Sequence, residues 1–127
     1  MSAPFLTVIT IEVGEKTTCR IGGTITDHAG AAIPAASLAT LTLTLYHRQS
    51  GTILNSRNAV NVLNTNGGTV TSGGVLTMVL DPADNALEFQ AGSRETHVAA
   101  FDWTYNSGAA TGRSLVEFPV RNFSKVT

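Results

Sequence analysis

The chain has 127 residues, a formal net charge of −1 at pH 7 and a pI near 6.2. Hydrophobic residues make up 43% of the sequence and charged residues 13%, which indicates a folded domain and not a disordered chain. The near-neutral charge excludes the basic footprint of a nucleic-acid-binding protein. A chain of this length can bury one core without disulfides or metal ions, so we expect a single domain over residues 1–127.

The N-terminal segment does not have the pattern of a targeting sequence. It lacks a basic n-region, and Thr7, Thr10 and Glu12 interrupt its apolar residues. No run in the sequence approaches the roughly 18 apolar residues of a transmembrane helix. We therefore expect neither export nor a membrane partner, and residues 1–5 could form an extended arm.

The first half of the chain predicts short strands separated by turns. Strict alternation over 40–45 places three Leu on the core face and three Thr on the solvent face. The second expected strand carries Cys19, Ile21 and Ile25 on one face. Residues 27–30 read as a turn, because Asp comes first and Gly last. The other strands expected here cover 5–13, 17–26, 52–56, 59–63 and 69–72.

The second half predicts a strand over 75–80, then one or two helical turns near 81–87. Asp81 can cap such a turn and Pro82 suits its first position. An aromatic strand over 97–105 follows, with Phe101, Trp103 and Tyr105 on one face. A return strand over 114–123 has Val116, Phe118 and Val120 inward. Pro119 then points outward, which predicts an edge strand.

The count of seven to nine short strands, with no βαβ period, predicts an all-β antiparallel sandwich. A helical turn near 81–87, before the aromatic strand, is typical of immunoglobulin-like sandwiches. Cys19 is the single cysteine, which excludes an internal disulfide. We interpret it as a small buried hydrophobe, because Arg20 points to the opposite face and no His is close in sequence.

The sequence predicts no catalytic, cofactor-binding or metal-binding residues. His28, His47 and His97 are scattered, and none is convincingly paired with another ligand type at i, i+2 or i, i+4, whereas zinc needs three or four convergent ligands. Asp81 and Asp84 lie three residues apart, but calcium needs six to eight oxygens. The helix-cap interpretation explains Asp81 with fewer assumptions.

Other catalytic patterns are also missing. Glu88, Glu95 and Glu117 lie on different segments, so any glycosidase pair drawn from them is arbitrary. There is no Gly-x-Ser-x-Gly elbow. The glycine pairs at 67–68 and 73–74 precede strands and not helices, so they cannot place a phosphate on a helix N-terminus. A glycosylation sequon at 122–124 is expected to be idle without export.

Two residues of the aromatic strand invite a functional interpretation. Asp102 lies between two aromatic residues, and we expect an outward carboxylate paired with an Arg across the sheet. Trp103 would be a sugar platform if it were exposed. Its phase with Phe101 and Tyr105 predicts a core position instead.

Several segments carry a resemblance to a known group of proteins. They are GTITD at 23–27 with Gly30 after it, TLTLTLY at 40–46, ILNSR at 53–57, VLN at 62–64, PAD at 82–84, ETHVA at 95–99 and VEFPVRN at 116–122. The stretch that holds them, from Gly23 to the C-terminus, resembles small structural proteins encoded among the head and tail genes of tailed bacteriophages. These are sandwich-forming motifs and carry no catalytic fingerprint.

The resemblance implies an immunoglobulin-like virion component without an active site or cofactor. We expect a capsid decoration (cement) protein that acts by surface burial, with the major capsid protein as its partner. The alternative is a neck, tail or baseplate component that contacts portal, neck or tail proteins. Self-association is compatible with either role. The expected location is the virion, after assembly in the host bacterial cytoplasm.

Two hypotheses of other classes stay open at this point. A carbohydrate- or receptor-binding module would need exposed aromatic side chains beside polar groups, and Trp103 and Tyr46 are the residues to inspect. A small hydrolase would need a His within hydrogen-bond reach of a Ser or carboxylate in a pocket.

Overall fold

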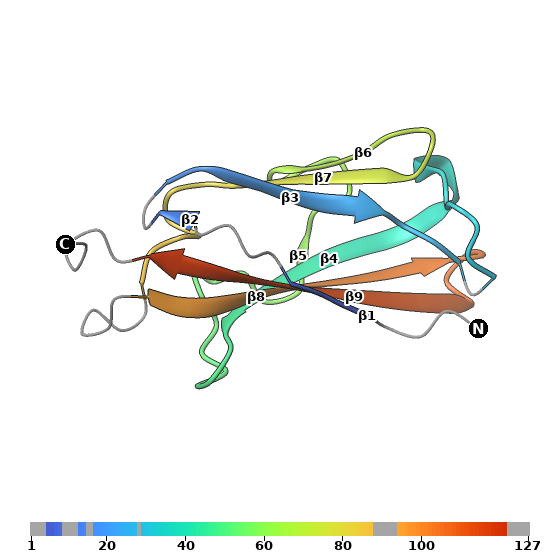
Figure 1. The fold of residues 1–127 in the computed structure, drawn as a ribbon. Helices are drawn as coiled ribbons and strands as arrows, with labels where there is room; N and C mark the ends of the chain where they lie inside the picture. Colours follow the sequence, from blue (N-terminus) through green and yellow to red (C-terminus); the bar gives the residue numbers. More distant parts are fainter. Residues whose placement is uncertain (1–4, 9–12, 15–16, 28, 88–93, 122–127) are drawn as a thin grey trace.

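In the computed structural model, two β-sheets lie face to face (Figure 1). The structure describes residues 5–8, 13–14, 17–27, 29–87 and 94–121. The larger sheet has the order β1-β9-β8-β4-β5, with β2 also beside β9, and the smaller has the order β3-β7-β6. The strands are β1 (Phe5–Val8), β2 (Val13–Gly14), β3 (Cys19–Thr24), β4 (Leu38–His47), β5 (Val60–Asn61), β6 (Gly68–Val70), β7 (Val75–Leu80), β8 (Arg94–Tyr105) and β9 (Ala110–Arg121).

The predicted alternation of β4 is confirmed. Leu41, Leu43 and Leu45 are fully buried and face the smaller sheet. On the neighbouring strand β8, Phe101 and Trp103 lie opposite Leu43 and Leu41 and are buried on the same face. Since one face of both strands is apolar, their register is fixed by what must enter the core.

The smaller sheet supplies the other wall of the core. In β7, the predicted inward residues Leu76, Met78 and Leu80 are all buried, and Ile21 of β3 lies opposite Met78. The buried hydrophobic side chains of both sheets form one continuous cluster. The predicted all-β sandwich is thus confirmed.

The sandwich is not purely antiparallel. Strands β1 and β2 run parallel to β9, with Phe5 beside Ser114 and Val13 beside Val120. Strand β9 therefore has neighbours on both sides, and the prediction that the Pro119 strand is an edge is wrong. Pro119 is opposite neither β1, which ends beside Glu117, nor β2. Among the described residues, the parallel pairing includes Glu117 and Val120 but not Pro119, so its missing N–H breaks no described hydrogen bond on that side.

Two further expectations are corrected. Residues 81–87 form no regular helix; the backbone N–H groups of residues 84, 85 and 86 bond to carbonyls three residues earlier, which makes consecutive turns. The helix that the described residues do contain is a 3₁₀ turn at Ala35–Ser37. Residues 52–56 form no strand either, since only the isolated bridge between Tyr46 and Ile53 occurs there. Of the expected arm, Phe5 begins β1, and residues 1–4 lie outside the described residues.

Candidate interaction surface

A buried carboxylate ties two loops together at one end of the sandwich. The Asp84 side chain is fully buried and accepts hydrogen bonds from Arg57 Nε at 2.8 Å and Nη2 at 2.9 Å. Asn55 Nδ2 donates to it at 2.8 Å, and the backbone N–H of Asp81 donates at 2.9 Å. Asp81 Oδ1 in return accepts the backbone N–H of Asp84. The predicted capping role of Asp81 is therefore confirmed, although what it caps is a turn.

The charge of Asp84 is stabilised by these donors. Burial by itself would raise the pKa of Asp84. The hydrogen bonds from Arg57, Asn55 and the Asp81 backbone, together with the Arg57 charge, outweigh burial and hold the pKa of Asp84 below its usual value. The pKa of Arg57 is raised, chiefly by its hydrogen bond to Asp84. All these contacts join residues of the same chain, so we interpret the cluster as a structural clamp between two of its loops.

Cys19 is half-buried, and burial raises the pKa of its thiol. The Asn85 side chain lies within 3.6 Å of the sulfur and works in the opposite direction, by lowering the pKa. Asn85 also donates to the carbonyl of Thr17 at 2.6 Å. A thiol in this setting is a poor nucleophile, as the sequence predicted.

Two histidines and a glutamate meet on the inner face of the larger sheet, where the neighbouring strands β4 and β8 pair. His97 Nε2 lies 2.5 Å from Glu95 Oε2, two residues away on the same face of β8. The expectation that no His has a convincing partner at i, i+2 is therefore wrong, because alternate residues of a strand share a face. The ring of His47 lies edge-on to that of His97, with centroids 6.3 Å apart.

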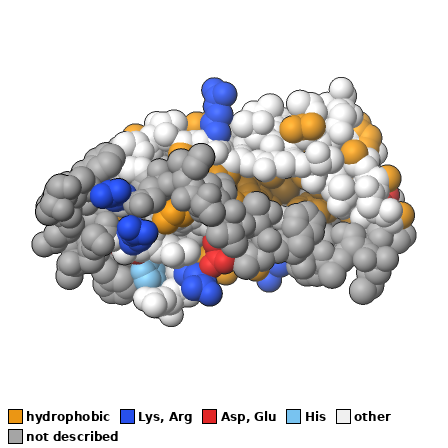
Figure 2. Space-filling view, viewed as in Figure 1, with side chains coloured by type: hydrophobic (Ala, Val, Ile, Leu, Met, Phe, Trp, Pro, Cys, Tyr) orange, Lys and Arg blue, Asp and Glu red, His pale blue; other side chains and the backbone are white. Residues whose placement is uncertain are grey.

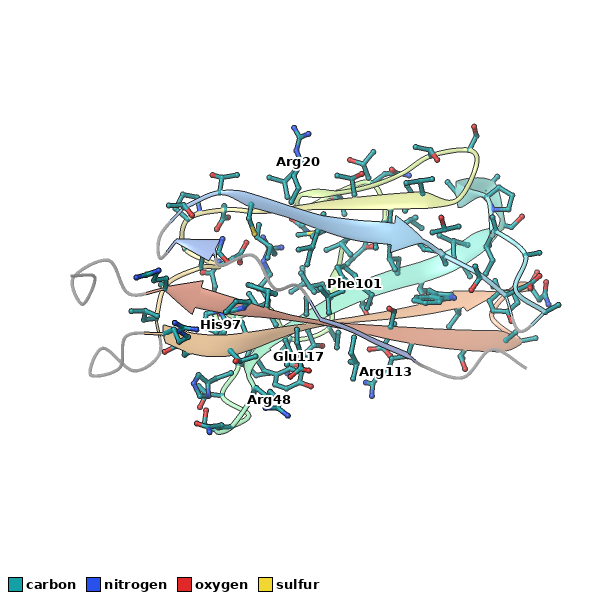
Figure 3. All side chains as sticks on the ribbon, viewed as in Figure 1. Arg20, Arg48, His97, Phe101, Arg113 and Glu117 are labelled. Carbon is teal, nitrogen blue, oxygen red and sulfur yellow. The ribbon has the colours of Figure 1, made fainter. Side chains whose placement is uncertain are left out.

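The geometry of these histidines favours structure over catalysis. His47 Nδ1 lies 3.2 Å from both the backbone N and the Oγ of Ser50, in the turn that follows β4. A His within reach of a Ser and another within reach of a carboxylate are thus present, as a hydrolase would require. However, His97 is fully buried and His47 is 4% exposed, so neither ring faces an open cleft. Figure 3 shows His97 between the sheets.

The outer face of the larger sheet is a ladder of uncharged polar side chains. We call it the threonine face, and it consists of Thr40, Thr42, Thr44, Thr104 and Thr111 with the pair Asp102 and Arg113. Thr40 and Thr104 hydrogen-bond to each other across β4 and β8 at 2.7 Å. Most of these residues line a shallow groove of about 320 Å³. This surface is flat, polar and open to solvent.

The expected partner of Asp102 is present on the threonine face. Arg113 Nε lies 2.6 Å from Asp102 Oδ1, across β8 and β9, and the two side chains are 55% and 38% exposed. A second ion pair, from Arg48 to Glu117 at 2.5 Å, lies further along the same face (Figure 3). Each of these two ion pairs is neutral, so the four residues add no net charge to the face.

Trp103 lies in the core, as its phase predicted. It is 5% exposed, and its ring covers Gly112 so closely that a Cβ there would lie 2.4 Å from Trp103 Nε1. Trp103 therefore cannot be a sugar platform. Tyr46, the other aromatic residue considered for that role, is half-buried on the outer face.

Some residues considered in the sequence lie outside the described residues: His28, Glu88, Asn122 and Ser124. Among those described, no three His, Cys, Asp or Glu side chains come together in a way that could hold a metal ion. The described part of the chain also contains no helix with the length and apolarity needed to cross a membrane.

Comparison of the chain with known protein families, with curated proteins and with solved structures finds no match.

Proposed function

We propose that this chain is a bacteriophage virion structural protein, specifically a capsid decoration (cement) protein that binds the outside of the capsid by surface burial. The observation that carries the proposal is the threonine face. It combines polar side chains, partial solvent access and the paired charges of Asp102 and Arg113, with the hydrogen-bonded Thr40 and Thr104 at one end. Uncharged polar surfaces of this kind suit hydrated contacts with another protein.

A structural role is also supported by where the reactive groups lie. Asp84 and Arg57 bind each other, and Glu95 binds His97 inside the sandwich. These groups stabilise the fold. The described surface is therefore more suited to binding another protein by contact than to chemistry. A small contact of this sort is weak for one copy, but many copies on a symmetric lattice can compensate for that. No enzymatic activity is proposed.

A neck, tail or baseplate component is the alternative within the same class, with portal, neck or tail proteins as partners. The threonine face would be the contact surface in either role. The location of the protein in the particle therefore distinguishes a decoration protein from a neck, tail or baseplate component. A receptor-binding role would have to use other groups than Trp103, since that ring is buried. We place the protein in the virion after assembly in the host cytoplasm.

The test is reconstruction of the intact particle by cryo-electron microscopy, with and without imposed symmetry. We expect density for this sandwich at capsid symmetry positions, with the threonine face toward the capsid. Density only at the unique portal vertex would assign it to the neck or tail, and absence from the particle would refute both versions.

A matched pair of variants tests the face. Thr40→Arg places a bulky charge on the threonine face, whereas Thr69→Arg places it on exposed β6 of the smaller sheet. We expect Thr40→Arg to lower capsid occupancy at least tenfold and Thr69→Arg to leave it unchanged. Equal occupancy of the two variants would exclude the threonine face as the contact.

A further inference from the structure

An apolar slot of about 100 Å³ opens between the two sheets, on the side where β3 faces β9. Its walls are the backbone of β3 and inward side chains of the other strands: Leu76, Phe101, Trp103, Ser114 and Val116. Figure 2 shows hydrophobic side chains in the hollow below the smaller sheet. The slot is large enough for one apolar side chain.

The slot exists because an inward position of β3 has no side chain. Gly23 is in phase with the inward residues Ile21 and Ile25, yet it is exposed, and a Cβ built on it would meet no atom of the described residues within 4 Å. At Gly22, by contrast, a Cβ would lie 2.1 Å from the carbonyl oxygen of Leu76. The space under Gly23 is therefore a vacancy in the core that opens to solvent.

A buried hydrogen-bond donor borders this vacancy. Trp103 lines the slot, and its Nε1 is buried without a hydrogen-bond partner. Burying an N–H without a partner costs free energy, so native proteins rarely leave such a group unsatisfied.

The slot lies beside a strand edge that no described strand occupies. β3 pairs with β7 on one side only. The backbone N–H of Val79, opposite Arg20, bonds to Gly67 on the far side of β7. In an antiparallel strand, successive residues direct their backbone N–H and C=O groups to alternate sides. The backbone groups of Arg20, Gly22 and Thr24 therefore face the open edge. They form a template for one more strand.

The outer surface of this edge is positively charged. Arg20 is exposed and projects from β3 away from the core (Figure 3). In an added strand, the residues next to an inward side chain face outward, beside Arg20. Charge complementarity therefore favours an acidic residue at those positions.

We propose that the edge of β3 and the slot under Gly23 bind an extended segment of a partner protein as an added strand. One apolar side chain of the segment enters the slot, and an adjacent acidic residue faces Arg20. Backbone hydrogen bonds supply affinity and the slot supplies specificity, as in other strand-addition complexes. The inference rests on the proposed function, since it describes how a neighbouring virion protein would be held, but its test needs no particle.

The probe is the capped peptide Thr-Thr-Glu-Leu-Glu-Thr-Thr, with variants that carry Met or Phe in place of Leu and one that carries Ser. The chain has a single Trp, so its indole N–H gives one NMR signal that reports on the slot. We expect the apolar peptides at millimolar concentration to shift this signal and the backbone amides of Arg20, Gly22 and Thr24. The Ser peptide should bind at least tenfold more weakly.

Gly23→Val fills the slot where a side chain has room, and we expect it to weaken peptide binding at least tenfold without lowering the melting temperature. Thr69→Val, on exposed β6 of the same sheet, is the matched control and should bind as the parent does. Should Gly23→Val fail to fold, Arg20→Glu gives a second test. Arg20→Glu should weaken binding of the Glu-containing peptide and strengthen binding of a peptide with Lys in place of Glu, each by about fivefold.

Three results would overturn the proposal. The first is no shift of the indole signal with any apolar peptide, which would make the slot a packing defect. The second is peptide binding that survives both Gly23→Val and Arg20→Glu. The third is a concentration-dependent shift of the same signals without peptide, which would assign the slot to a second copy of this chain. None of these results depends on where the protein lies in the virion.

Discussion

The Asp84 carboxylate shows how a single residue can join segments that are distant in sequence. Its ligands come from residues 55 and 57 and from the turn that contains it. A carboxylate without these donors would be costly to bury. The clamp therefore holds the loop after β4 against the turn after β7, and it makes the stability of the fold dependent on one ionised group.

We predict that the stability of the protein falls in acid because of Asp84. Its pKa is lower in the folded chain than in the unfolded one, so its contribution is present above the unfolded pKa of roughly 4 and is lost as pH falls through the folded pKa. Asp84→Asn should cost about 3 kcal/mol at neutral pH, because it removes the buried charge partner of Arg57 and leaves it only the exposed Asp81, 3.8 Å away. Urea unfolding between pH 2 and 7 measures both effects.

Asp102→Asn is the control for this prediction. It removes the exposed ion pair with Arg113, which should change the free energy of unfolding by less than about 1 kcal/mol. An Asp84→Asn protein with the same acid sensitivity as the parent would show that other groups control the acid response.

Among the elements, β8 is the structural centre of the larger sheet. It has twelve residues and is hydrogen-bonded along its length to β4 on one side and β9 on the other. Strand β6 has three residues and pairs with β7 alone. A long, doubly bonded, buried strand opens only when the whole domain unfolds, whereas a short edge strand can fray.

We therefore predict that native-state hydrogen exchange separates the two strands. Backbone amides from Val98 to Phe101 should exchange at the rate of global unfolding. Those of Thr69 and Val70 should exchange faster and with little dependence on denaturant. Equal protection of both strands would mean that β6 is lost only in global unfolding.

At the scale of the whole molecule, one core joins both sheets. Cys19 lies on the smaller sheet and Trp103 on the larger, and the cluster that contains Trp103 has Cys19 packed against it. Since no boundary divides this core, the two sheets should unfold together, as small single domains usually do.

This predicts one transition by two independent probes. The half-buried Cys19 thiol, with its raised pKa, should be slow to alkylate in the folded protein and fast in the unfolded one. The denaturant midpoint from Cys19 alkylation should coincide with that from Trp103 fluorescence. Earlier exposure of Cys19 would indicate that the smaller sheet separates first.

The sequence by itself determined most of the strands and the inward faces of the long ones. Alternation at Leu41, Leu43 and Leu45, and the shared phase of Phe101 and Trp103, predict the core correctly because side-chain direction in a strand is a local property. The pairing of Asp102 with an Arg across the sheet could be expected for the same reason. Local signals also predicted the cap at Asp81.

Only the tertiary structure decided what depends on distant segments. The parallel neighbours of β9, which make it an interior strand, depend on where β1 and β2 lie in space. The clamp between Arg57 and Asp84 joins residues 27 positions apart. The slot under Gly23 forms where an inward position of β3 without a side chain faces the other sheet. None of these has a periodic signal, because each is set by how the packed layers meet and not by the conformation of one segment.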